Sequence, residues 1–341
     1  MPLAAPDASR RLRLAFVGCG AIARWHLAAI TAAAARTDVT VAVDTEPDRA
    51  AALAAEAGAE AFSSWEAAVH GAAFDAVLLM VPHHRHEELA LAAVASDKHV
   101  LLEKPLAATV EGAERILAAA RDSHRVFMVA ENAHFWPEVR RVAELLHDGA
   151  VGELVTARAW HCAPPMPEFH GPGAWRLAVD SAGGGVAIDA GSHWLRPLRL
   201  WCGELAEVVA VTARPYAAME GESLCRALCR FDSGVVASFD AILSPGPVAP
   251  VPLFQVTGTA GELVVDGTGR VKLYDGTDQR GTVVADGGGY LRSYEHQIAA
   301  FEAAVLDGAP PPVGPEYALG ELRGALAMYR SAASRRWEPV W

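Results

Sequence analysis

Residues Leu14–Ala23, LAFVGCGAIA, decide the fold of this chain. The short apolar run leads directly into Gly18-x-Gly20-x-x-Ala23, a spacing typical of a strand that turns into a helix beneath a diphosphate. Gly18 permits the tight turn, Gly20 lets the backbone approach the anion, and the small Ala23 allows helix and strand to pack closely. The amide groups at the helix start then bind the anion, aided by the helix dipole. We expect Gly20, Ala21 and Ile22 to supply those amides.

A second apolar run supports the same reading. Val39 to Val43 ends in Asp44, about 26 residues after Gly18 and near the usual ~20. A carboxylate at that position accepts hydrogen bonds from a ribose 2′-hydroxyl and repels a 2′-phosphate. The sequence therefore predicts NAD rather than NADP, and Arg49 is the nearby cation that argues the other way.

Composition limits the remaining possibilities. The 341 residues are 52% hydrophobic, which is enough for two domains with cores of their own. Charged residues or histidines interrupt every apolar run before the ~18 residues of a membrane span. The leader MPLAAPDASRRLR has no apolar segment, and its first ten or so residues are expected to be disordered. We therefore expect a cytoplasmic protein that does not insert into membranes.

Charge and cysteine content exclude further classes. A formal net charge of −12 argues against a nucleic-acid partner, which requires a basic face. It leaves room for a cationic small molecule, such as an amino sugar. The five cysteines are an odd number without a CxxC pair, which suits a reducing compartment.

Strand and helix patterns alternate up to about residue 130, which predicts a parallel sheet covered by helices on both faces. We assign residues 11–130 to this doubly wound, Rossmann-type domain. The expected strands are Asp75–Val81, His99–Leu102 and Val126–Ala130, and the expected helices Glu87–Ala95 and Thr109–Asp122.

The pattern changes after Val151 to polar and apolar residues in alternation, separated by Gly-rich turns. This predicts an α+β domain over residues 131–341, with a large, open, mostly antiparallel sheet whose uncovered face makes a homodimer or homotetramer. The C-terminal helix is free to pack back on the first domain. The expected strands are Leu154–Trp160, Glu207–Thr212, Leu224–Phe231, Val235–Ile242, Leu253–Thr257, Glu262–Val265 and Val271–Tyr274, and the closing helices Ser293–Leu306 and Glu316–Ser334.

Two motifs follow strands of the first domain at the edge where doubly wound folds bind ligands. Glu103-Lys104-Pro105 follows HVLL, so we expect Lys104 to point into a cleft, the alternative being a solvated loop lysine. Pro82-His83-His84-Arg85-His86 follows the strand ending at Val81. We expect Pro82 and His86 beside the nicotinamide, although the histidines could equally cap or pack a helix.

A third motif, GGGVAIDAGSH, ends with Asp189 and His193 four residues apart. If the segment is helical, both side chains project from one face, with histidine as acid–base and aspartate as its orienting partner. The alternative is a surface histidine on an ordinary helix. A zinc site would need a third ligand, for which only His83, His84 and His86 are candidates, and we predict no metal.

Taken together, these motifs resemble the glucose-fructose oxidoreductase, inositol dehydrogenase and MocA (Gfo/Idh/MocA) family over nearly the whole length. The resemblance implies a Rossmann domain followed by a domain with a large open sheet that often mediates dimers or tetramers. It also implies a catalytic group carried by Lys104, Asp189 and His193. His83 stands where that family usually has Asn, and Asn132-Ala133-His134 departs from its pattern before the FxP turn. The substrate therefore stays open. The resemblance rests on VPHHRHEELALAAVASDKHVLLEKPLA, ENAHFWPEVRRVAELLHDGAVGEL, GAWR, GGGVAIDAGSHWL, LCRFDSGVVASF and FQVTGTAGELVVDG.

The predicted activity is NAD-dependent oxidation of a secondary hydroxyl of a sugar, amino sugar or cyclitol. His193 would take the hydroxyl proton, Lys104 would stabilise the oxygen, and Asp189 would orient His193. The alternatives are an NAD(P)H-dependent reductase of a ketosugar or imine and a non-catalytic, cofactor-sensing regulator. We expect cofactor contacts from Gly18, Gly20, Ala21, Ile22, Asp44, Pro82, His86, Glu103 and Lys104, and substrate contacts from Glu131, Asn132, His134, Trp160, His161, Trp175, Arg176, Asp189 and His193.

Overall fold

The structure is a computed structural model of the 341-residue chain, and it describes residues 10–33 and 36–341. The expected disorder at the N-terminus falls almost entirely outside the described residues. The chain divides into two compact units, Met1–Ala130 with Tyr294–Ala318, and Glu131–Ser293 with Leu319–Trp341. None of the helices in the described residues is long and apolar enough to cross a bilayer.

The first unit is built on a six-stranded parallel sheet of order β3-β2-β1-β4-β5-β6. The order reverses at β1, which places the loops after β1 and β4 at the switch point where doubly wound sheets bind ligands. The strands are β1 (Leu12–Val17), β2 (Thr37–Val43), β3 (Glu60–Phe62), β4 (Ala76–Leu79), β5 (His99–Glu103) and β6 (Phe127–Ala130).

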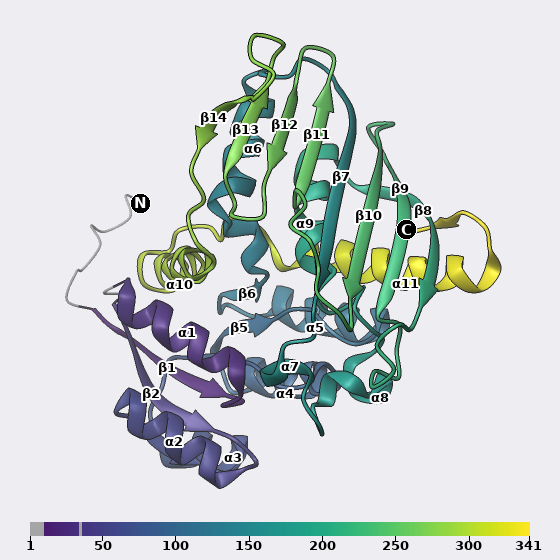
Figure 1. The fold of residues 1–341 in the computed structure, drawn as a ribbon. Helices are drawn as coiled ribbons and strands as arrows, with labels where there is room; N and C mark the ends of the chain where they lie inside the picture. Colours follow the sequence, from purple (N-terminus) through teal and green to yellow (C-terminus); the bar gives the residue numbers. More distant parts are fainter. Residues whose placement is uncertain (1–9, 34–35) are drawn as a thin grey trace. The chain divides into compact units, whose positions relative to one another are not determined.

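Strands β4 and β6 of this sheet are apolar throughout because helices cover both faces (Figure 1). All four residues of β4 are buried, and Leu78 and Leu101 have no exposed surface. The predicted doubly wound sheet is confirmed. Its helices are α1 (Ala21–Ala32), α2 (Pro47–Ala57), α3 (Trp65–Gly71), α4 (His86–Ala95), α5 (Val110–Asp122) and α10 (Tyr290–Asp307), with the 3-10 turn η1 (His83–Arg85).

Helix α10 joins this unit by buried and half-buried polar contacts. Thr37 Oγ1 donates to Glu302 Oε2 at 2.9 Å, and Arg36 forms ion pairs with Glu302 and Asp307. Near the other end of α10, Tyr294 meets the ring of His26 edge to face. The helix that returns to the first unit is thus α10, whereas the last helix, α11 (Ala318–Ser334), lies in the second unit from Leu319.

The second unit is built on a nine-stranded mixed sheet of order β14-β13-β12-β11-β7-β10-β9-β8-β15. Only β7 and β10 pair in parallel, and the remaining pairs are antiparallel. This confirms the predicted large, mostly antiparallel sheet and adds two edge strands, β14 and β15. The strands are β7 (Leu154–Ala163), β8 (Leu205–Ala213), β9 (Leu224–Phe231), β10 (Val236–Leu243), β11 (Phe254–Gly258), β12 (Glu262–Val265), β13 (Val271–Tyr274), β14 (Thr282–Ala285) and β15 (Glu338–Pro339).

Helices lie on one face of this sheet. The other face is turned toward the viewer in Figure 1. In β9, Cys225, Ala227 and Cys229 are buried while the residues between them are not, as expected for a sheet covered on one side. The helices of the covered face are α6 (Pro137–His147), α9 (Ser192–Cys202) and α11; the short elements η2 (Asn132–Phe135), α7 (Pro167–His170), η3 (Trp175–Leu177), α8 (Val179–Ala182) and η4 (Pro315–Tyr317) complete the chain.

Candidate active site

The glycine loop between β1 and α1 has the geometry of a diphosphate cradle. Gly18 adopts a φ of +93°, and a Cβ there would lie 2.3 Å from the carbonyl oxygen of Met80. A Cβ on Gly20 would meet no described atom within 4 Å, so this side of the loop is open. Helix α1 starts at Ala21 without a side-chain cap, which leaves first-turn amides to an outside acceptor. The residues therefore fit the pyrophosphate of a dinucleotide.

Asp44 follows β2 and turns its carboxylate toward this loop. Its Oδ2 accepts a hydrogen bond from the Cys19 amide at 2.8 Å, and its Oδ1 accepts one from Glu46 N at 2.9 Å. Burial and the Asp44 charge raise the pKa of the Cys19 thiol to about 12, so this cysteine stays neutral. Arg49, the cation that argued for NADP, is an exposed residue of α2.

Lys104 follows β5 on a backbone that is held from both sides. Glu103 is buried, with its Oε1 2.7 Å from His26 Nε2, and its Oε2 accepts from the Lys104 amide at 3.2 Å. On the other side, Pro105 O lies 2.7 Å from His86 Nδ1. These contacts fix the main chain from which the lysine side chain extends.

The structure corrects the expected role of His86. The ring is fully buried, and its two nitrogens face the carbonyl oxygens of Pro105 and Val81 at 2.7 and 3.0 Å. Burial lowers the pKa of His86 to about 4, even though the two carbonyls act in the opposite direction. His86 therefore braces the Lys104 loop, which agrees with the alternative of a packing histidine. His83 is likewise buried, with its ring against that of His86, and Pro82 is half-buried.

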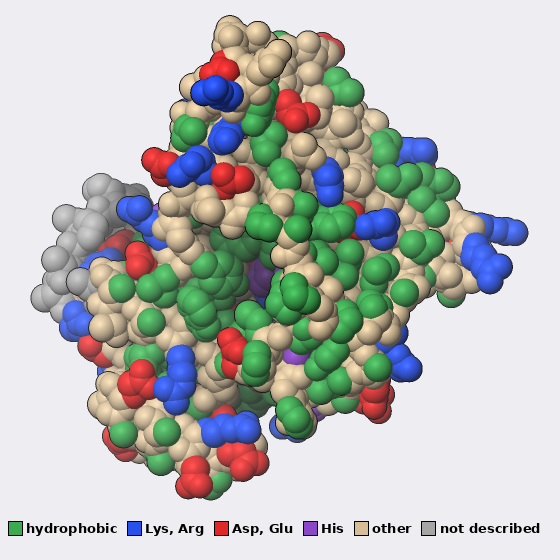
Figure 2. Space-filling model, viewed as in Figure 1, with side chains coloured by type: hydrophobic (Ala, Val, Ile, Leu, Met, Phe, Trp, Pro, Cys, Tyr) green, Lys and Arg blue, Asp and Glu red, His purple; other side chains and the backbone are tan. Residues whose placement is uncertain are grey.

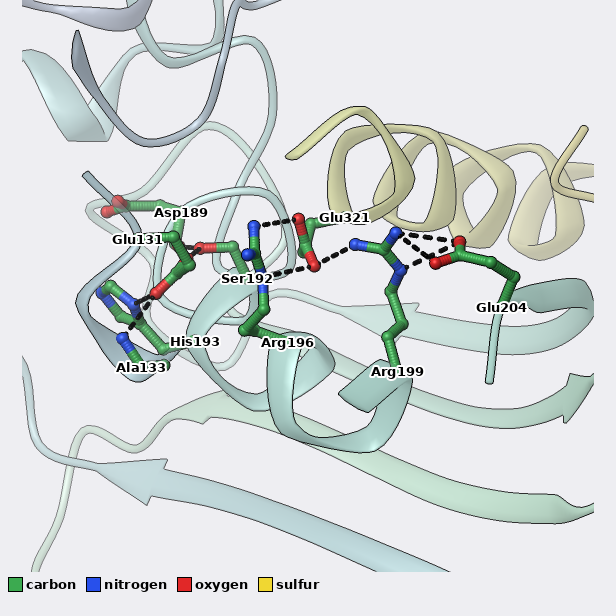
Figure 3. A network of polar contacts seen from close by, with 9 residues as sticks. All are labelled: Glu131, Ala133, Asp189, Ser192, His193, Arg196, Arg199, Glu204 and Glu321. Atoms are coloured by element: carbon green, nitrogen blue, oxygen red, sulfur yellow. Dashed lines mark hydrogen bonds and ion pairs between the residues drawn. The ribbon is translucent and has the colours of Figure 1, made fainter. Parts of the chain in front are cut away.

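His193 lies at the start of α9 and has a carboxylate partner that the sequence reading did not assign to it. Its Nδ1 is 2.5 Å from Oε1 of Glu131, a residue only 2% exposed (Figure 3). Ser192 Oγ donates to Glu131 Oε2 and the Ala133 amide donates to Oε1, both at 3.0 Å. Glu131 was expected on a substrate wall, but in the structure it is the partner of His193.

Asp189 has a different partner. Asp189 precedes α9 in a segment of turns, so Asp189 and His193 do not lie on one helix. The expectation that both side chains project from one helix face required that they did. Its Oδ2 accepts from Arg176 Nε at 3.0 Å, and the Arg176 guanidinium lies 4.2 Å from the ring centroid of Trp175. Asp189, Arg176 and Trp175 thus form one cluster, and Glu131 has the place beside His193 that we expected Asp189 to take.

The glycine run before Asp189 is held by two half-buried polar side chains, Glu222 and Tyr329. Glu222 Oε1 accepts from the Ala187 amide at 2.8 Å and from the Tyr329 hydroxyl at 3.0 Å. Tyr329 in turn accepts from the Gly185 amide at 3.0 Å. Burial raises the pKa of the Glu222 carboxyl. A Cβ on Gly185 would lie 2.0 Å from the Glu222 carbonyl oxygen, which explains the glycine there.

The structure separates Trp160 from His161. They are adjacent in β7, so their side chains point to opposite faces of the sheet. The ring of His161 packs against that of Trp194 of α9, with ring centroids 4.1 Å apart. Trp160 lies instead under the guanidinium groups of Arg158 and Arg226 on the face without α9. His161 is therefore on the side of His193, and Trp160 is not.

His134 lies in η2, immediately before α6. Burial, together with the charges of Arg196 and Arg140, lowers its pKa to about 4, so it is a neutral hydrogen-bonding group near pH 7. Asn132 of the same turn donates to Ser293 Oγ at 2.9 Å, which leaves its amide engaged within the unit. Among the residues described, no group of three or more His, Cys, Asp or Glu is arranged to hold a metal ion.

A chain of buried charges holds α9 against α11 (Figure 3). Arg196 Nε and Nη2 donate to the two oxygens of Glu321 at 2.8 and 2.9 Å. Arg199 also pairs with Glu321, and its Nη2 lies 2.6 Å from Glu204 Oε1. Because both arginines are almost fully buried, this network fixes the helix that carries His193.

Together the glycine loop, Asp44 and the charged groups at the sheet edge define a dinucleotide-dependent oxidoreductase. The model of the oxidoreductase family with an NAD-binding Rossmann fold matches residues 12–131, and that of the GFO/IDH/MocA C-terminal domain matches residues 139–264. The chain belongs to this family and has its NAD-binding domain.

Named relatives cover most of the chain. A 1,5-anhydro-D-fructose reductase of Ensifer adhaerens is 31% identical over 335 residues, which are 94% of this chain and 96% of that enzyme. A levoglucosan dehydrogenase of Pseudarthrobacter phenanthrenivorans is 27% identical over 257 residues, or 68% and 66% of the two chains. The crystal structure of an NAD-binding oxidoreductase from Klebsiella pneumoniae has a TM-score of 0.83 at 26% identity, covering 97% and 99% of the chains.

The buried network yields a stability prediction. Glu321→Ala leaves Arg196 and Arg199 without this carboxylate and should lower the free energy of unfolding by about 3–5 kcal/mol. Glu144→Ala, which breaks the exposed pair with Arg141, is the control and should cost at most about 1 kcal/mol. Urea unfolding measures both changes in the free energy of unfolding, provided that the m-value stays unchanged. Equal effects of the two variants would contradict the role of Glu321 in holding α9 against α11.

Proposed function

We propose that this chain is an NAD-dependent dehydrogenase that oxidises a secondary hydroxyl of a sugar, an amino sugar of aminoglycoside type, or a cyclitol to a ketone. The supporting observation is the position of Lys104. Lys104 directly follows Glu103, the last residue of β5, and Glu131 directly follows Ala130, the last residue of β6. Glu103 and Ala130 are register partners on these neighbouring strands. Both chemically active segments thus leave the edge of the sheet that also presents the glycine loop.

In the proposed reaction, NAD supplies the hydride acceptor when bound. Lys104 donates a hydrogen bond to the reacting oxygen, and His193 takes the hydroxyl proton. Asp189 holds the guanidinium of Arg176, which contacts the substrate. The cofactor contacts are Gly18, Gly20, Ala21, Ile22, Asp44, Pro82, Glu103 and Lys104, and the substrate contacts are His134, His161, Trp175, Arg176, Asp189 and His193.

The 1,5-anhydro-D-fructose reductase and the levoglucosan dehydrogenase support the substrate class, because both enzymes are named for anhydrosugars. A second candidate function, reduction of a ketosugar or imine with NADH or NADPH, is favoured by the relative that is named a reductase. The same residues would serve in reverse. A cytoplasmic location is supported by the five cysteines, all of which are free thiols.

Replacement of the two proton-transfer groups tests the chemistry. Lys104→Ala and His193→Ala should each lower kcat by roughly a hundredfold, because they act mainly in the transition state. NAD affinity should stay nearly unchanged. Lys98→Ala is a matched control, since Lys98 precedes the same strand and donates to Phe74 O at 2.8 Å. The substrate is first found by an NADH-formation screen over polyols, sugars and amino sugars, with the reverse reaction measured on the derived ketones.

Wild-type turnover in either variant would contradict the assignment. A strong chelator should leave activity unchanged, whereas loss of activity and recovery with zinc would favour a metal-dependent reaction.

Asp44 predicts the choice of cofactor. A 2′-phosphate beside this carboxylate meets like-charge repulsion and loses hydrogen bonds, together roughly 2–4 kcal/mol, so NAD should bind more than tenfold tighter than NADP. Asp44→Ala should narrow the gap by weakening NAD more than NADP. Asp48→Ala, in the first turn of α2, should not. Isothermal titration decides the question, and equal wild-type affinities would refute the proposal.

We further propose that the uncovered sheet face pairs two copies in a symmetric homodimer, two of which could form a tetramer. Adjacent strands bring Val209 beside Leu228 and Val211 beside Arg226 on this face. Val211 is 63% and Leu228 46% exposed. Figure 2 shows hydrophobic side chains, with a few cationic ones, gathered on the strands turned to the viewer. Such a patch normally marks a partner surface.

The assembly is tested by light scattering at micromolar concentration. The expected mass is that of two or four chains, and Val209→Asp with Val211→Asp should give monomers or aggregates because the charges cannot be buried. Val155→Asp is the control, because Val155 is an exposed valine of β7 whose side chain points to the opposite face of the sheet. A wild-type mass of one chain, unchanged on concentration about tenfold, would show that the face needs no second copy.

A further inference from the structure

We infer that Glu131 is the positioning residue of His193: it keeps the imidazole proton on Nδ1 and turns Nε2 toward the substrate as the base. This inference rests on the proposed dehydrogenase function. It moves the orienting role from Asp189, four residues before the histidine, to a carboxylate that follows the last strand of the parallel sheet.

The geometry at Nδ1 leaves one arrangement of protons. A carboxylate accepts hydrogen bonds and donates none, so the 2.5 Å contact requires the proton on His193 Nδ1. The neutral ring then carries its lone pair on Nε2, the form that a general base needs. Side-chain exposure is 12% for His193 and 2% for Glu131, so the pair is shielded from water and its interaction is strong.

Glu131 is itself fixed in a form suited to this role. Its Oε1 accepts from the Ala133 amide at 3.0 Å. Its Oε2 accepts from the Ser192 hydroxyl, which lies 3.0 Å from both this oxygen and the Asp189 carbonyl oxygen and shares one proton between them. Donors on both oxygens favour the ionised carboxylate. One donor lies in η2 and the other is the first residue of α9. The carboxylate therefore cannot rotate without breaking one of these two hydrogen bonds.

The electrostatic surroundings explain why the histidine needs this partner. His193 is the second residue of α9, where the positive end of the helix dipole opposes a protonated imidazole. Arg196, one turn later, is paired with Glu321, and the burial of His134 leaves that ring neutral near pH 7. Asp189, the other nearby acid, is bonded to Arg176. Glu131 is thus the anion in contact with the imidazolium formed during the reaction.

In the oxidation direction the proton and electron balance is simple. The hydroxyl O–H bond breaks and its proton passes to His193 Nε2, while the carbon–hydrogen bond breaks and its electron pair goes with the hydride to NAD. The carbonyl double bond forms in the substrate. Glu131 stays a carboxylate throughout, and His193 then releases the proton to water.

Two variants separate charge from geometry. Glu131→Gln keeps the shape and can still accept from Nδ1, but it removes the negative charge. We expect kcat to fall about 10- to 100-fold with KM within about twofold, since the imidazolium is stabilised only as the proton moves. The acidic limb of the kcat/KM profile should move to lower pH by about one unit. Ser192→Ala removes one anchor of Glu131 and should give a smaller effect in the same direction.

A spectroscopic measurement tests the pair without any substrate. In ¹⁵N-labelled wild-type protein, His193 should give a strongly deshielded Nδ1 proton and nitrogen shifts of the Nδ1–H form. The proton signal should move upfield in Glu131→Gln and disappear in His193→Ala. Glu302→Gln is the matched control, because Glu302 is also a buried carboxylate but bonds to Thr37 and Arg36. It should leave the His193 signals and the pH profile unchanged.

The outcomes separate this inference from the proposed function. If no sugar or cyclitol is oxidised or formed but the deshielded proton depends on Glu131, the pair stands and the activity is wrong. If turnover requires His193 while Glu131→Gln has wild-type kcat, pH profile and proton spectrum, the positioning role is overturned. A stable, folded Glu131→Gln protein whose kcat/KM falls by the same factor at every pH, with no shift of the acidic limb, would also overturn it, because that indicates a structural role alone.

Discussion

Buried carboxylates paired with histidine or arginine are the interaction on which the rest of this site depends. A charge removed from water is costly unless a partner compensates it at close range, so each pair fixes two segments of chain relative to one another. Glu131 does this for η2 and α9, Glu321 for α9 and α11, and Glu103 for β5 and α1. The functional side chains are extensions of these fixed points.

The same constraint explains why the functional segments are short loops after strands. Strands β4 and β6 of the parallel sheet are apolar along their whole length, so the polar side chains of this region lie where the strands end. Lys104 and Glu131 are the first residues after β5 and β6, and Asp44 is the first after β2. In the second unit, the histidine instead begins a helix whose other charged residues, Arg196 and Arg199, are neutralised within the unit.

Much of this could be predicted from the sequence, and the part that could not has a physical reason. The apolar run before Gly18 and the alternation in β9 depend on local periodicity, so the parallel sheet and the open sheet were both predicted and confirmed. The partner of His193 could not be read from spacing, because Glu131 lies 62 residues before it. The available signal was position: Glu131 follows a buried strand, at the edge where ligand-binding residues gather. The pairing of His26 with Glu103 was missed for the same reason.

The histidines show that environment, and not residue type, assigns the chemistry. His86 faces two carbonyl oxygens inside the protein, and burial makes it a neutral brace with a pKa of about 4. His134 is neutral near pH 7 for the same reason, with two arginines nearby. His193 instead combines a carboxylate on one nitrogen with a partly exposed ring at a helix start. A motif of histidines therefore says little about proton transfer until the partner of each ring nitrogen is known, and here that partner comes from the end of a distant strand.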